Sequence, residues 1–145
     1  MIYKDLLAAY KAKHGKLVEP RQGWDSLHRS LWLAYSMGRV RHFTDLGTYV
    51  SKPGDHGIGP PCYAFDLGRD DRFLFKGWGY LRARRLAKLY VAEHKALKIN
   101  YVILGQRIWG PIKPKDPNDP PQPFWHPLTT GDTSHAFHIH VSGLP

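Results

Sequence analysis

Apolar residues recur at helical spacing, every three or four positions, in three segments of the chain. This periodicity predicts helices over residues 2–14, about 26–37 and 79–98. The first pattern ends in a basic turn followed by a glycine, and Asp25 or Ser26 can cap the second with a side-chain oxygen. In the third, the cations lie mostly outside the apolar side, which is typical of a helix packed against a core.

Strand patterns occupy much of the remaining chain. Residues 63–67 are typical of a short buried strand, and the β-rich run 99–104 leads through a Gly-Gln turn into a partner strand over 107–109. The proline-rich segment 110–127 predicts a long loop, because proline cannot donate a hydrogen bond to a sheet. Residues 136–142 alternate, with both histidines on one face. The sum is an α+β fold, with helices flanking a small, mainly antiparallel sheet.

The chain is short enough for one domain. Its 145 residues, of which 42% are hydrophobic, can build one packed core, so we expect a single domain over residues 1–145. The two N-terminal helices then fill residues 1–40. The first residues include an acidic side chain and no long apolar run, so we expect no signal peptide, no membrane span and a soluble product made in a cytoplasm.

Charge and cysteine content limit which partners the chain can attract and which kinds of metal site it can form. The formal charge of +9 and a pI near 9.8 predict attraction to polyanions, which leaves nucleic acid, anionic cell-wall polymer and a membrane surface open. Cys62 is the only cysteine, which excludes an intramolecular disulfide and a zinc site built mainly of thiolates. Metal binding would therefore use the nine histidines and the carboxylates.

Three short segments carry residues that suit a hydrolytic metal site. They contain His56, Asp66, and the pair His138 and His140. Each segment alone is more often structural, because buried histidines and aspartates in glycine-rich loops are common. Together they supply imidazole and carboxylate donors, which zinc prefers, with room for a water molecule. The alternation of the last strand puts one histidine beside the other, where it can reach substrate.

The same segments resemble a known family. Residues 52–66 read KPGDHGIGPPCYAFD, residues 97–109 read LKINYVILGQRIW, and residues 135–142 read HAFHIHVS. In order and spacing these blocks are similar to the motifs of the D-alanyl-D-alanine carboxypeptidase group of zinc peptidases, in its actinobacterial and phage subgroup. The resemblance covers about residues 45–142, which would form the zinc-peptidase-like core.

The resemblance implies a hedgehog/DD-peptidase fold and activity on the stem peptides of peptidoglycan. It implies that His56, Asp66 and His140 bind Zn²⁺. From the chemistry of such a site, we expect His138 to stabilise the developing oxyanion or to move a proton. It also implies a phage lysin or a virion-borne module that degrades the wall. Other virion proteins are then expected partners.

Two departures from the family pattern lie beside the expected metal. Phe137 stands where the family has an acidic general base, so His138, His135 or Asp132 would have to accept the proton. The segment 60–63 makes the stretch between the first two ligands three residues longer than in the family. Within it, Cys62 is either an alternative ligand or a small buried apolar residue.

Several other residues have both a functional and a structural interpretation. Arg107 and Trp109 can line a substrate groove, with Arg107 holding a peptide carboxylate, or they can be a solvated hairpin residue and a core residue. Aromatic residues bounded by glycine and proline can stack on sugars or anchor loops; these are Trp78, Tyr80 and Trp125. A basic helix face can bind anionic wall polymer or be simply solvated; it comprises Arg82, Arg84, Arg85 and Lys88.

Two main hypotheses on function follow. The first is a zinc-dependent peptidoglycan peptidase. The second is a catalytically degenerate member of the same fold that serves as a phage structural protein, such as a tail component, or as a wall-binding protein. We do not expect nucleic-acid binding, because it rests on net charge alone and no recognition motif accompanies it.

Overall fold

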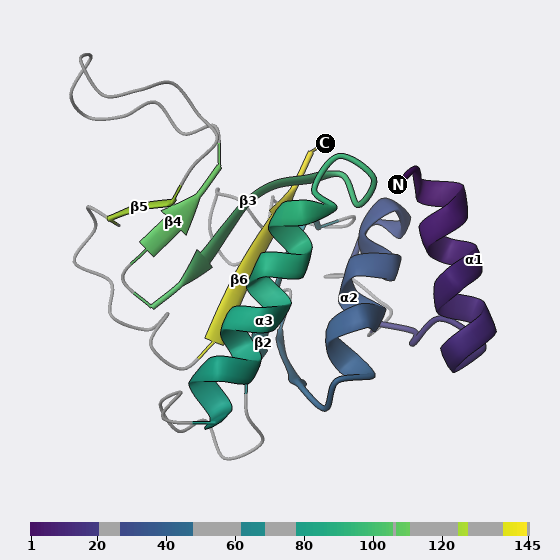
Figure 1. Cartoon of the computed structure of the whole chain (residues 1–145), viewed down its shortest axis with the longest axis horizontal. Coiled ribbons are helices and arrows are strands. Elements are labelled where there is room, and N and C mark those ends of the chain that lie inside the picture. The colour runs from purple at the N-terminus through teal and green to yellow at the C-terminus, as the bar shows by residue number, and fades with distance from the viewer. Residues whose placement is uncertain are drawn as a thin grey trace.

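The computed structural model describes residues 1–20, 27–47, 62–68, 78–105, 107–110, 125–127 and 138–144 (Figure 1). The helices in these segments are α1 (Tyr3–His14), a short 3-10 helix (Arg29–Leu31), α2 (Trp32–Arg39) and α3 (Trp78–Ala92). The strands are β1 (Thr44–Gly47), β2 (Ala64–Gly68), β3 (Ile99–Leu104), β4 (Arg107–Trp109), β5 (Trp125–Pro127) and β6 (His138–Gly143).

The described strands form one antiparallel sheet in the order β1-β2-β6-β3-β4-β5. The last strand in sequence, β6, lies between β2 and β3, so that it is hydrogen-bonded on both sides. In Figure 1, α3 and α2 lie on the same face of this sheet. The α+β class with a small antiparallel sheet and flanking helices is thus confirmed.

The hydrophobic core fills the space between the helices and this face. Strand alternation turns one set of side chains toward the helices, all of them buried: Phe65, Leu67, Val102, Leu104, Ile139 and Val141. From α3, Ala83, Leu86, Ala87 and Tyr90 pack against them. The buried Tyr90 hydroxyl donates to the Ala34 carbonyl of α2 at 2.7 Å, which joins the two helices.

Several predicted elements are confirmed within one or two residues. The helix predicted over 2–14 is α1, the strand over 63–67 is β2, and the hairpin of 99–104 with 107–109 is β3 and β4. Gly105 lies in the turn of this hairpin at φ 63°, a conformation that glycine adopts without strain.

The predicted second helix begins later than expected. Its first turn is the 3-10 helix at Arg29, capped by His28, whose Nδ1 accepts a hydrogen bond from the Ser30 backbone at 3.2 Å. Leu27 instead forms a parallel bridge with Cys62, which holds this point of the chain in extended form. The predicted caps, Asp25 and Ser26, lie outside the described residues.

Three other elements differ from the prediction. Helix α3 ends at Ala92 rather than 98, because residues 93–98 form turns and Lys98 adopts φ 60°. Strand β5 falls inside the predicted loop 110–127. Its Pro127 is tolerated because β5 lies at one edge of the sheet that the described strands form. Strand β1 has no alternating pattern and was not predicted.

Within the described part of the chain, no helix combines the length and apolar character that crossing a bilayer requires.

Candidate functional site

Three of the predicted site residues lie on the sheet face opposite the helices. Asp66 of β2 pairs directly with His140 of β6, and Gly68 pairs with His138. Since Phe65, Leu67, Ile139 and Val141 are turned into the core, the intervening residues must face the other way. The predicted placement of both histidines on one face is therefore confirmed.

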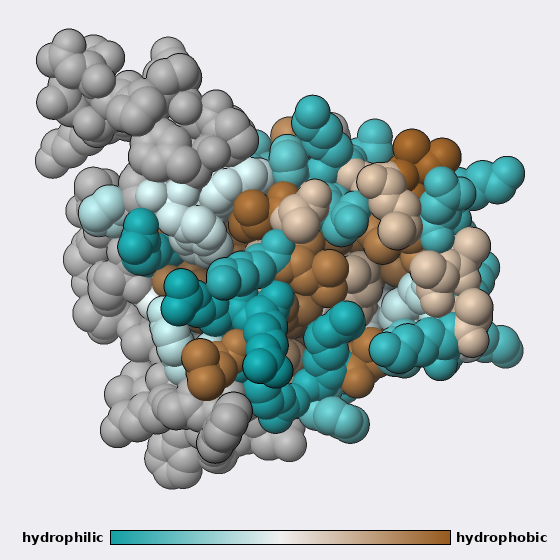
Figure 2. Space-filling model, viewed as in Figure 1, coloured by the Kyte–Doolittle hydropathy of each residue, from teal (hydrophilic) through white to brown (hydrophobic). Residues whose placement is uncertain are grey.

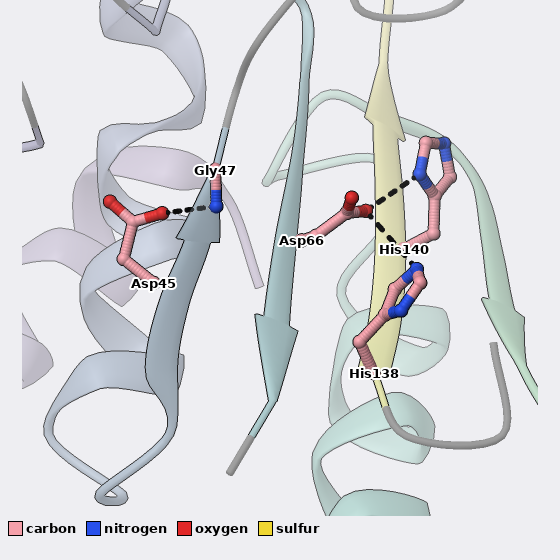
Figure 3. A network of polar contacts seen from close by, with 5 residues as sticks. All are labelled: Asp45, Gly47, Asp66, His138 and His140. Atoms are coloured by element: carbon pink, nitrogen blue, oxygen red, sulfur yellow. Dashed lines mark hydrogen bonds and ion pairs between the residues drawn. The ribbon is translucent and has the colours of Figure 1, made fainter. Parts of the chain in front are cut away.

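The three side chains converge on one carboxylate oxygen. Nδ1 of His140 donates a hydrogen bond to Oδ1 of Asp66 at 2.8 Å, and Nε2 of His138 lies 3.6 Å from the same oxygen. Figure 3 shows both rings turned toward Asp66, with the second ring nitrogen of His140 directed away from it. Oδ1 of Asp66 and Nδ1 of His140 are close enough to approach one metal ion together, and the proton on Nδ1 would have to leave for both atoms to bind it.

The site is largely buried, with one partly open group. The side chains of His138 and His140 are 9% and 8% exposed, whereas the side chain of Asp66 is 23% exposed. The Tyr101 ring stacks on His140, with ring centroids 5.6 Å apart and planes inclined by 24°. This stacking restricts the orientation of the His140 imidazole. By its exposed fraction, the carboxylate of Asp66 is the most accessible of the three groups.

The strand beside Asp66 is braced by a second polar network. Gly47 of β1 pairs with Asp66 at a β-bulge, and its N–H donates to Oδ1 of Asp45 at 2.7 Å. The Tyr35 hydroxyl donates to the other Asp45 oxygen at 2.9 Å and accepts from Arg39 at 2.7 Å. Burial, followed by the negative charge of Asp45, raises the pKa of Tyr35 to about 12. The network ties β1 to α2 next to the site.

The donor types of the site suit zinc. A carboxylate oxygen and imidazole nitrogens are its common ligands, and Asp66 and His140 already present one of each at contact distance. Among the described residues, no three His, Cys, Asp or Glu side chains are arranged to hold a metal together. A metal held by Asp66 and His140 would therefore need a third ligand from another part of the chain.

The remaining predicted site residues cannot be placed in this geometry. His56, His135, Asp132, Phe137, and positions 60 and 61 lie outside the described residues. Cys62 is described and fully buried, and its carbonyl accepts a hydrogen bond from the His28 backbone at 2.8 Å. This placement agrees with the interpretation of Cys62 as a small buried residue.

Arg107 and Trp109 are not brought together with Asp66. Their register partners on β3 are Leu104 and Val102, both turned toward the helices, so Arg107 and Trp109 lie on the helix side of the sheet. Trp109 is buried and packs edge-on against His94, with ring centroids 4.7 Å apart, whereas Arg107 is exposed. These are the positions expected of a core residue and a solvated hairpin residue, and strand alternation explains why neither faces Asp66.

Sequence reasoning missed two groups near the site. Tyr101 lies in the predicted strand 99–104, and its alternation with Val102 was the signal that it shares a face with the histidines. The network of Tyr35, Asp45 and Gly47 had no such signal, because it joins a helix to a strand that has no recognisable pattern. No family model, curated protein or solved structure matches the chain.

Proposed function

We propose that the protein is a zinc-dependent peptidase of the D-alanyl-D-alanine carboxypeptidase type that cleaves the stem peptides of peptidoglycan. The observation that carries the proposal is the contact between Oδ1 of Asp66 and Nδ1 of His140. It supports the ligand assignment, because two residues that the family resemblance pairs on one metal are adjacent here. The hedgehog/DD-peptidase fold is part of the same proposal.

In this proposal, Asp66 and His140 hold the metal together with His56. When bound, zinc supplies Lewis acidity for a scissile carbonyl and for an attacking water. The residues of the chain orient the ligands and exclude water. Tyr101 keeps the His140 ring oriented, and the largely buried site limits access of competing solvent. His138, 3.6 Å from Asp66, is close enough to the reaction centre to move a proton or to stabilise developing negative charge.

Phe137 replaces the acidic general base of the family pattern, so another side chain must accept the proton of the attacking water. On this face, His138 is the imidazole whose Nε2 lies 3.6 Å from Oδ1 of Asp66. We therefore assign the proton transfer to His138, with His135 as the alternative from the same terminal segment. An imidazole can perform this role because its ordinary pKa, about 6.5, lies near neutral pH.

A second candidate function follows from the same substitution. If no imidazole replaces the base, the chain keeps the fold and loses the chemistry, serving as a phage structural or wall-binding protein. Both candidates act at the bacterial cell wall, either as a phage lysin or as part of a virion.

Mass spectrometry of peptidoglycan fragments separates the two candidates. Purified peptidoglycan is incubated with zinc-loaded protein, with the chelator-treated protein and with His140→Ala as controls. The peptidase proposal expects new peptide products with the zinc-loaded protein alone. No products, although one zinc is bound per chain, would contradict it; Phe137→Asp would then be expected to gain activity if only the base is missing.

A further inference from the structure

A basic groove lies on the helix side of the sheet, away from Asp66. Its volume is about 300 Å³, and it is lined by Tyr80, Arg84, Lys88, Leu104, Arg107 and Trp125. Figure 2 shows hydrophilic side chains gathered over α3, the helix that forms one wall. Two features that are separate in sequence, a basic helix face and isolated aromatic residues, thus meet in one concave site.

The groove is built by four elements of regular structure, α3, β3, β4 and β5. Tyr80, Arg84 and Lys88 follow one another at four-residue intervals, so they form one stripe along α3. On the opposite wall, Arg107 begins β4 and donates to the backbone carbonyl of Trp125, the first residue of β5, at 3.3 Å. The cations are therefore held on a rigid frame.

The positive charge of the groove is not neutralised by the described part of the chain. The ion pairs found there involve neither Arg84, Lys88 nor Arg107. Helix α3 contains no acidic residue from Trp78 to Ala92. Three cations in a concave surface, without a carboxylate between them, create a site for an anion. Tyr80 and Trp125 add apolar ring surface beside it.

We propose that this groove binds an anionic, phosphodiester-linked polymer of the bacterial cell wall. Arg84 and Lys88, one helical turn apart, contact phosphate oxygens, and Arg107 adds a planar fork that suits them. Tyr80 and Trp125 cover the polyol or sugar unit that the phosphate carries. The choice of a wall polymer rests on the proposed function, whereas the anionic and aromatic character rests on the groove itself.

Two other ligands fit the groove less well. A stem-peptide carboxylate would use one cation and leave the others unused. Base-specific nucleic-acid recognition needs amide or carboxylate side chains at base edges, and the groove lining has none. Single-stranded nucleic acid bound without specificity spreads over successive stacking platforms, whereas about 300 Å³ holds roughly one ring with its phosphate.

The location gives the groove a role that the catalytic face does not have. Because Arg107 and Asp66 are on opposite faces of the sheet, a polymer in the groove leaves the Asp66 face open. The wall polymer would keep the protein on its target while stem peptides are cut on the other face.

The test is a titration of the full chain with purified poly(ribitol phosphate) in the presence of a chelator, so that binding is measured without bond cleavage. The groove variant is Arg84→Ala with Lys88→Ala. The control is Arg85→Ala with Lys95→Ala, which removes the same charge from exposed positions outside the groove. Thermal unfolding of each variant shows that the fold is retained.

We expect the groove variant to weaken binding about 10- to 100-fold. The control should weaken it by no more than about threefold, and Tyr80→Ala by about 3- to 10-fold. Equal losses in the two double variants would overturn the proposal, because they would indicate general charge attraction. Tighter binding of oligothymidine with the same number of phosphates would also overturn it, in favour of nucleic acid. Because no bond is cut, neither result depends on peptidase activity.

Discussion

Asp66 and His140, 74 residues apart in sequence, are directly opposite each other on β2 and β6 and share a hydrogen bond of 2.8 Å. The position of β6 in the middle of the sheet creates this contact, because β6 is the strand that pairs with β2 on one side and β3 on the other. The same arrangement places Tyr101 of β3 against the His140 ring. The site is therefore supported by the three central strands.

The two histidines of β6 are expected to have different roles. His140→Ala should lower zinc affinity more than about 100-fold, since it removes a ligand rather than an outer contact. His138→Ala removes an outer contact to Asp66, so it should lower zinc affinity by less than about 100-fold but lower kcat about 10²- to 10⁴-fold. The two residues are almost equally buried, so each variant controls for the truncation of the other. Loss of zinc in His138→Ala would show that His138 is itself a ligand.

Alkaline pH is expected to destabilise the protein through Tyr35. Its pKa is raised to about 12 in the folded protein, so above pH 10 the unfolded chain loses a proton that the folded chain retains. The contribution of Tyr35 to the free energy of unfolding is thus fully present below pH 10. It falls as the pH rises toward 12, by about 2–3 kcal/mol in total.

Urea unfolding of wild type and Tyr35→Phe between pH 9 and 12 measures this contribution. The phenylalanine variant keeps the ring but cannot ionise, so its stability should fall less with pH. The pKa of Tyr90 is also raised by burial, but that residue is present in both proteins and cancels in the comparison. Parallel pH profiles for the two proteins would show that Tyr35 is not the titrating group.

The contact of α2 with the sheet is expected to tolerate no side chain at Gly38. A Cβ atom there would overlap Cδ1 of Leu67 and lie 2.9 Å from the Tyr90 hydroxyl. Gly38→Ala should therefore lower the free energy of unfolding by about 1–3 kcal/mol, although alanine favours helix. The same substitution in a Leu67→Ala background should cost less, because the overlapping methyl group is gone. An unchanged cost would mean that Leu67 is not the obstacle.

The sequence predicted the site best where a strand pattern fixed side-chain direction. The alternation of His138, Ile139 and His140 was enough to place both histidines on one face, because the period of a strand is two. Their proximity to Asp66 was not readable from alternation, since the pairing of β6 with β2 depends on contacts across 74 residues. The family resemblance supplied that pairing as an expectation.

Other features of the structure were not predicted correctly from the sequence, for identifiable reasons. Strand β1 is four residues long and contains a bulge at Gly47, so it carries no periodic signal. Pro127 argued against a strand, yet the edge position of β5 makes its missing N–H harmless. Arg107 and Trp109 resembled substrate residues through their motif, but their register on β3 directs them to the helix side.

The central claim is that Asp66 and His140 are two ligands of one zinc ion, and zinc titration of wild type and Asp66→Asn against a competing chelator tests it most directly. Asparagine keeps the size of the side chain and removes its charge. Outer contacts to a zinc ligand typically contribute about 10- to 100-fold in affinity, so a ligand should contribute more. We expect one zinc per wild-type chain and a loss of more than about 100-fold in Asp66→Asn. Wild-type protein that binds no zinc, or an Asp66→Asn variant that binds it within tenfold of wild type, would contradict the claim.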